Sequence, residues 1–364
     1  MKEVGGIYSF RLSWRMVTQM LFPNYKVEVG SESFNPDSQS IVGFNIKLGL
    51  GPKVDSFELL LVKDDRSLKI TRNDFVNVFL GYEDDMEKVF SGLVETVEKG
   101  ISTVRVFGLA FSVNFLLFRI NKVYLNQTAG QIVSDLLSSV KQRMKEVKWF
   151  PVEEGQIMDG LSFPVYVVDN RLSAYEHIEK LAKRSNYVFY ISSENKLFFK
   201  KFEEGEVQVL KYGRDIIEVN VTKMVGQYDS VIVYGESPSS WSGRETYHWL
   251  SKREVFGLAS YSSTEGQKEV SRRHLLTMQD SVIKDGDTAF TTAGNVANIV
   301  NSELQVVLKV VGSSKLKVND TVKVEGLEGD AFNSQLRIVE VEHYLSRVDG
   351  FTSIITCVPE EKAL

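Results

Sequence analysis

Short runs of acidic residues are the first feature of this sequence that could do chemistry. They occur at Asp64-Asp65, Glu83-Asp84-Asp85 and Glu203-Glu204. Two carboxyl groups held about 5–10 Å apart in a cleft can hydrolyse a glycosidic bond. Each run, however, falls at the end of a predicted strand, where a solvated turn is the simpler explanation, and the chain has 48 Asp and Glu residues in all. We therefore assign none of these runs a catalytic role.

Histidine and cysteine offer little material for a metal site. The chain has four histidines and one cysteine, and no His-x-x-x-His or Cys-x-x-Cys spacing occurs, so we expect no metal and no cofactor. His343 is in phase with Val339 and Val341 on a predicted strand, which indicates a half-buried structural histidine. The lone Cys357 excludes an intrachain disulfide.

Motifs for phosphate binding and for serine hydrolysis are incomplete. Gly49-Leu-Gly51-Pro52 lacks the third glycine and the following helix of a dinucleotide-binding loop, and no P-loop motif occurs. Gly235-Glu-Ser237-Pro-Ser239 lacks the second glycine of a nucleophile elbow. We therefore predict that the protein is not an enzyme and has no catalytic residues.

An irregular stretch rich in aromatic residues, 237–261, could contact a sugar or a partner. It contains Trp241, Tyr247, His248 and Trp249. Aromatic rings with a polar edge suit such surfaces, although a packing contact of the loop is at least as good an explanation. The basic cluster Arg272-Arg273-His274 lies in a predicted helix of alternating charge, which is typical of a solvated face.

Composition restricts the classes of function further. Lys and Arg number 43 against 48 Asp and Glu, a net charge of −5, whereas a dedicated duplex-DNA binder normally has a basic surplus. No signal peptide is visible, and the longest apolar runs, such as 59–62 and 115–118, are far too short to span a membrane. We expect synthesis in the cytoplasm, no membrane insertion and no specific binding of nucleic acid.

Hydrophobic residues alternate with period two along the first part of the chain and again along the last. This pattern predicts strands near 25–29, 41–48, 56–62, 75–82, 88–97 and 103–107, with a bulge or bend at Gly92. It also predicts strands near 217–221, 228–235, 304–310, 321–325, 336–345 and 351–358, the last two flanking the turn Asp349-Gly350. We interpret 1–110 and 206–364 as two β-barrel domains, the second with a loop and helical excursion at about 237–302.

Helical signals fill the middle of the chain and part of that excursion. Thr128 and Gln131, and again Ser173 and Glu176, have the spacing of capping boxes that open helices with one apolar face. Strands near 163–168, 187–191 and 196–202 follow them, so 111–205 is predicted to be a small α+β insert. Further helices are predicted at 267–279 and 288–302. The fold class is therefore mainly β with an α+β insert between two barrels.

Several short phrases of sequence occur in a fixed order along the chain. They are 74–82 (DFVNVFLGY), 88–94 (KVFSGLV), 104–108 (VRVFG), 125–133 (LNQTAGQIV), 172–199, 316–324 (LKVNDTVKV), 339–343 (VEVEH) and 350–352 (GFT). In this order they resemble the phage tail (baseplate) hub proteins, which include the late control D family, the Mu-like hub and the N-terminal part of VgrG. One departure is Asn319, which stands where that family usually has glycine.

The resemblance implies a structural role in the tail of a phage, a phage-like particle or a contractile injection system. Such hubs are homotrimers whose six tube-like barrels form a pseudo-sixfold ring between the hexameric tail tube and the central spike. The implied partners are the tail tube, the spike, tape-measure and baseplate wedge proteins, in a virion assembled from chains made in the host cytoplasm. DNA or cargo would cross the lumen without specific binding. The alternative is a carbohydrate-binding or carbohydrate-degrading β protein of a tail tip.

Overall fold

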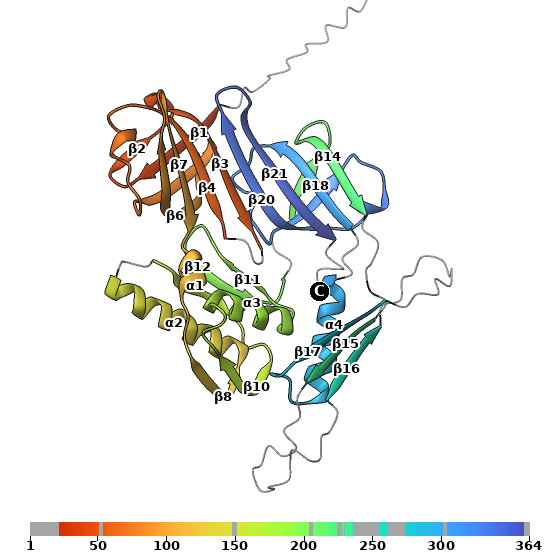
Figure 1. Ribbon diagram of the computed structural model, residues 1–364. Helices are drawn as coiled ribbons and strands as arrows, with labels where there is room; N and C mark the ends of the chain where they lie inside the picture. The colour runs from red at the N-terminus through yellow and green to blue at the C-terminus, as the bar shows by residue number, and fades with distance from the viewer. Residues whose placement is uncertain are drawn as a thin grey trace, which may run out of the picture.

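The computed structural model describes residues 22–50, 54–147, 151–203, 207–223, 228, 230–235, 255–260, 274–300 and 304–359. Strands dominate it, and the elements form four groups (Figure 1). Two β-rich units lie side by side in the upper half of the view, and two smaller α+β groups lie below them. The predicted class, mainly β with an α+β insert, is confirmed.

The first β-unit is a curved antiparallel sheet wrapped around one apolar core. Its strands are β1 (Pro23–Val29), β2 (Glu32–Phe34), β3 (Ile41–Gly49), β4 (Ser56–Val62), β5 (Phe75–Tyr82), β6 (Asp85–Lys99) and β7 (Thr103–Ala110), in the order β3-β4-β7-β6-β5-β1-β2. Alternate residues of every strand enter the core, as the period-two pattern predicts. β6 continues through Gly92, where glycine is required because a Cβ would lie 2.3 Å from the Leu109 carbonyl oxygen. Register shifts flank this position, at Lys88–Phe90 against β5 and between Val94 and Thr96 against β7.

The second β-unit is made from two separate stretches of chain. Its strands are β13 (Val207–Lys211), β14 (Ile216–Lys223), β18 (Leu304–Val311), β19 (Thr321–Glu325), β20 (Leu336–Ser346) and β21 (Gly350–Pro359), in the order β13-β19-β20-β21-β18-β14. Its core contains the alternating side chains Val306, Leu308 and Val310 of β18. The predicted Asp349-Gly350 hairpin is present between β20 and β21, with Gly350 at a φ of +72°.

The α+β insert follows β7. It contains α1 (Val113–Leu117), β8 (Lys122–Thr128), α2 (Ala129–Val147), β9 (Glu153–Ile157), β10 (Ser162–Val168), α3 (Ala174–Ser185), β11 (Val188–Ile191) and β12 (Lys196–Lys200). Both predicted capping boxes form: Gln131 and Thr128 exchange hydrogen bonds at the start of α2, and Ser173 and Glu176 do so at the start of α3.

A second small group interrupts the second β-unit between β14 and β18. It consists of β15 (Ser230–Gly235), β16 (Phe256–Ser260), β17 (Leu275–Asp280) and α4 (Gly286–Val300), with α4 packed on one face of the three-stranded sheet. The predicted helix 288–302 is confirmed as α4. The predicted helix 267–279 is wrong over its described part: Leu276 and Met278 alternate into the core beneath α4, so this segment is β17. The strand predicted at 228–235 is β15, which pairs with β16 and β17 and not with the second β-unit.

Candidate assembly interface

Apart from β2, which has no counterpart, the two β-units have the same strand order. In chain order, β1, β3, β4, β5, β6 and β7 correspond to β13, β14, β18, β19, β20 and β21, and each set is arranged with its first strand at one end and its second at the other. One pairing differs, since β1 is antiparallel to β5 whereas β13 is parallel to β19. The chain therefore contains one structural unit twice.

Shifts in strand pairing and turn hydrogen bonds show which residues of the two units correspond. The pairing of β6 with β7 shifts between Val94 and Thr96, and that of β20 with β21 shifts between Ile338 and Glu340. The turn before β5 and the turn before β19 both contain Asn-Asp. Asn73 donates its N–H to the Val94 carbonyl at 2.8 Å, and Asn319 donates to the Ile338 carbonyl at 2.9 Å. Val94 is thus the counterpart of Ile338, and Glu98 that of Glu342.

The same turns explain the departure of Asn319 from the glycine of the tail hub pattern. Asn73 and Asn319 have φ of +71° and +75°, in the left-handed region where glycine is unstrained and asparagine is the best-tolerated substitute. Asparagine therefore meets the backbone requirement in both units.

β3 and β14 correspond just as closely. β3 shifts register against β4 between Ile41 and Gly43, and β14 shifts against β18 between Ile216 and Glu218. Residues 41–48 (IVGFNIKL) thus align with 216–223 (IIEVNVTK). Asn45 is the counterpart of Asn220, Ile46 of Val221 and Lys47 of Thr222.

The two β-units are joined edge to edge by β3 and β20. Residues 43–49 of β3 pair antiparallel with residues 340–346 of β20, so one continuous sheet crosses both units (Figure 1). Asn45 Nδ2 donates to Glu342 Oε1 at 2.6 Å, and Lys47 Nζ lies 3.3 Å from the same oxygen. Leu345 is buried in the core of the first unit. We call this contact, 43–50 against 339–346, the internal junction.

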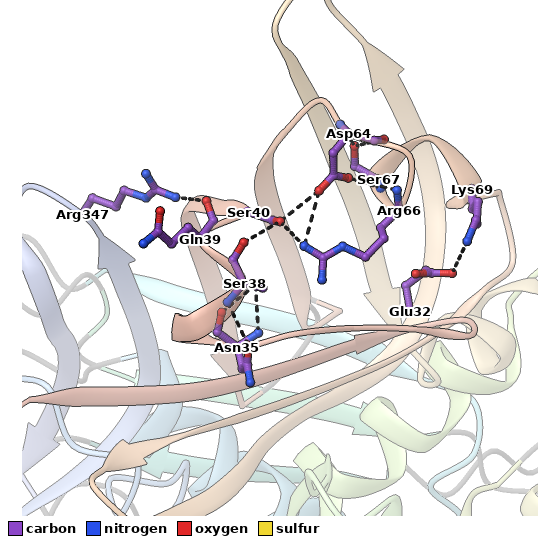
Figure 2. Close-up of polar contacts among 10 residues, drawn as sticks. All are labelled: Glu32, Asn35, Ser38, Gln39, Ser40, Asp64, Arg66, Ser67, Lys69 and Arg347. Carbon is purple, nitrogen blue, oxygen red and sulfur yellow. Dashed lines mark hydrogen bonds and ion pairs between the residues drawn. The ribbon is translucent and has the colours of Figure 1, made fainter.

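Arginine side chains fix the rim of the internal junction (Figure 2). Arg347 Nε donates to the Ile41 carbonyl at 2.9 Å, and its Nη2 donates to the Gln39 carbonyl. Arg66 Nη2 donates to Ser40 Oγ at 2.6 Å, and Ser40 Oγ donates to Asp64 at 3.0 Å. Burial alone would raise the pKa of Asp64, but hydrogen bonds from Ser67 and Ser40 and the charge of Arg66 hold it below its ordinary value. The start of β3 is thereby held from both sides.

The acidic run Glu83-Asp84-Asp85 forms the β5–β6 turn and lies beside the second unit. Asp85 binds Lys315 at 3.0 Å. Glu87, two residues further on, binds Lys317 at 2.9 Å, and the Tyr82 hydroxyl donates to the Gly312 carbonyl at 3.0 Å. These carboxylates therefore connect the two units, a role that the prediction of a solvated turn did not include.

A cavity of about 240 Å³ lies where the two units and the insert meet. Its walls include Leu48, Phe90, Tyr190, Asn195, Leu316 and His343. His343 Nδ1 lies 2.9 Å from Ser353 Oγ, and burial lowers the pKa of this histidine to about 4. Both side chains are 0% exposed, so this Ser–His pair is a structural contact. His343 is structural, as predicted, although it is fully buried where half-burial was expected.

Other residues singled out in the sequence do not converge on a site. Trp241, Tyr247, His248 and Trp249 lie outside the described residues, as do Arg272, Arg273, Glu204 and Ser237. Within the described part of the chain, no group of three His, Cys, Asp or Glu side chains could hold a metal ion. In the same part, no helix is long and apolar enough to cross a membrane.

The counterparts of the two junction strands each have an edge segment with no partner strand within the described residues. β14 pairs with β18 on one side and on the other makes only a single bridge, between Tyr212 and Ile216. Residues 95–99 of β6 pair with β7 on one side. On the other side β5 begins at Phe75, opposite Leu93, and no described strand lies along residues 95–99. We call these two segments, 216–223 and 95–99, the open edges.

Exposure differs sharply between the internal junction and the open edges. Ile46 is 0% exposed beside β20, whereas its counterpart Val221 is 41% exposed. Ile101, in the turn that follows residues 95–99, is 99% exposed. An unpaired strand edge presents free backbone N–H and C=O groups that can pair with a strand of another chain.

Comparison with known proteins agrees with the architecture. No known protein family matches the sequence, and no curated protein matches it either. Among solved structures, a 43 kDa tail protein of prophage MuSo2 from Shewanella oneidensis matches at a TM-score of 0.67 and 14% identity, over 94% of this chain and 99% of that one. The chain has the fold of a phage tail protein. A tail protein from Neisseria meningitidis matches equally well, with a TM-score of 0.68, 10% identity and coverage of 93% and 97%.

The same tail fold occurs outside phages. A component of the Escherichia coli type VI secretion system, described as structurally similar to tail proteins gp27 and gp5 of bacteriophage T4, matches at a TM-score of 0.57 and 12% identity. It is covered over 78% of its length, and this chain over 93%. Since all these identities are low, the likeness establishes a shared fold.

Proposed function

We propose that this protein is the structural hub of a phage-type tail, with no catalytic activity. The observation that carries the proposal is the internal junction: two units of the same strand order, joined edge to edge into one sheet. A chain that contains a repeated unit and still has open edges can continue the same contact with further copies. The likeness to tail proteins of phages and of a type VI secretion system supports this role.

The proposed assembly is a homotrimer. Three chains with two β-units each supply six similar positions, which match a hexameric tail tube on one side and a threefold spike on the other. The division at 1–110, 111–205 and 206–364 belongs to this proposal, with 1–110 and 206–364 as the tube-like domains. Tube, spike, tape-measure and baseplate wedge proteins are its proposed partners, and the baseplate of the tail its location.

The mass of the full chain in solution tests this proposal. We expect a concentration-dependent trimer by native mass spectrometry, alone or with the tail tube protein of the same particle. An image of the particle that resolves the tail end should show three copies in one ring. A different copy number there, or hydrolysis of peptidoglycan by the purified chain, contradicts the proposal.

A further inference from the structure

We infer that β14 of one copy pairs with residues 95–99 of β6 in the next copy, repeating between chains the contact that β3 and β20 make within one. This inference rests on the proposed ring and names the strands that close it. In the first unit, the strand that reaches across the junction is β3, and its counterpart in the second unit is β14. The strand that receives it is β20, and its counterpart in the first unit is β6.

The register follows from the two repeats. Within the chain, Lys47 stands opposite Glu342 and Ile46 opposite His343. Replacing each residue by its counterpart places Thr222 opposite Glu98 and Val221 opposite Lys99 of the neighbouring copy. The hairpin beyond Lys99 is shorter than the one beyond His343, so the ladder between copies is shorter than the internal one.

The polar contact at the internal junction is repeated in kind at the open edges. Asn45 donates to Glu342 across the junction, and the counterparts of these two residues are Asn220 and Glu98, the same residue types. Asn220 lies on exposed β14, and the side chain of Glu98 is 66% exposed. An asparagine and a glutamate at both pairs of positions fit one contact made twice, once within the chain and once between chains.

The directions of the backbone N–H groups of β14 also fit this pairing. Leu50 donates its N–H to the Val339 carbonyl at 2.8 Å, and alternate residues of an antiparallel strand face the same neighbour, so Ile46 also faces β20. Val221, the counterpart of Ile46, therefore directs its N–H to the open side, whereas Thr222 directs its N–H to β18. The contact is head-to-tail, with different surfaces on the two copies, which closes into a ring when the rotation allows.

Cysteine pairs test the register directly. The double variant Glu98→Cys with Thr222→Cys should form covalent dimers and trimers on oxidation. The matched pair Lys47→Cys with Glu342→Cys should close within one chain, and Glu98→Cys with Glu218→Cys, four residues out of register, should stay reduced. Native Cys357 is 0% exposed and can remain in place. If the trimer forms and the matched pair closes while the Glu98–Thr222 pair stays reduced, the strand pairing is wrong and the ring stands.

Proline substitutions provide a second readout. Val221→Pro removes an N–H that faces the open side, so the variant should keep its melting temperature within about 2 °C and lose the trimer. Thr222→Pro removes an N–H bonded to β18 and should lower the melting temperature itself. A trimer that survives Val221→Pro overturns the inference. A native chain that stays monomeric even with its tail tube protein overturns the proposed ring, and the strand pairing with it.

Discussion

The internal junction and the open edges are built from corresponding strands, yet only the junction is covered. At the junction, Ile46 is buried and Asn45 is hydrogen-bonded to Glu342; at the open edges, Val221 and Glu98 face solvent. Strands of similar sequence are thus buried at the junction and exposed at the open edges, and the difference lies in whether a partner strand is present. The comparison shows that similar residue types occur both in a covered strand pair and along an exposed strand edge.

The largest expected effect comes from placing a charge at matched positions of the two regions. Ile46→Asp buries an unpaired carboxylate in the core of the first unit, beside β20, and should lower the free energy of unfolding by about 4 kcal/mol. Val221→Asp, on the open edge, should change it by less than about 0.5 kcal/mol. Urea unfolding of the two variants measures this. Equal losses would mean that the open edge is already covered within one chain.

Acidification should weaken the internal junction through His343. Burial lowers its pKa to about 4 from an ordinary 6.5, so the folded chain resists a proton that the unfolded chain accepts. The contribution of His343 to stability should therefore fall by about 3 kcal/mol as pH drops from 6.5 to 4. Buried Asp55, which lines the same cavity and has its pKa raised to about 7, contributes in the opposite direction. Melting temperature against pH, compared with His343→Gln, isolates the effect. An unchanged pH slope in that variant would assign the acid sensitivity to other groups.

Removing one hydrogen bond at the internal junction should lower the free energy of unfolding by a smaller amount. Asn45→Ala deletes the contact to Glu342 and should cost about 1 kcal/mol of unfolding free energy. Asn220→Ala should leave the stability of the monomer unchanged and weaken association between copies. Chemical unfolding combined with sedimentation measures both quantities. A loss of monomer stability in Asn220→Ala would contradict the correspondence.

The smallest expected effect concerns the ion pairs between the β5–β6 turn and the second unit. Lys315→Ala together with Lys317→Ala should cost about 0.5 kcal/mol, because the lysine side chains are more than half exposed. The loss should shrink in high salt. Unfolding at low and high ionic strength checks this, and a larger, salt-independent loss would indicate that the lysine stems contribute by packing.

Periodicity predicted most strands of the two β-units, and the capping boxes predicted the starts of α2 and α3. It could not assign partners: β15 has the same alternation as β18 but pairs in a separate sheet. Leu275–Asp280 has only one β-branched residue, Thr277, so little in the local sequence favours a strand there, and its strand form depends on packing beneath α4.

The internal junction could not be predicted from the sequence because its residues are far apart in the chain. Nothing local to Asn45 indicates Glu342, which lies 297 residues away. The sequence does carry one signal of the duplication: the Asn-Asp phrases at 71–78 and 317–324 have the same spacing of Asn, Asp and two valines. Interpreted as an internal repeat, this shared spacing indicates that one unit occurs twice in the chain.

Duplication within a single chain frees the two copies of the unit to diverge. The β15–α4 group enters the second unit between β14 and β18, whereas the first unit crosses from β3 to β4 through residues 50–55. Six identical subunits would have to carry any appended group at every position around a ring. A duplicated chain can place it at every second position, and this is how an adaptor can present sixfold geometry to one neighbour and threefold geometry to the other.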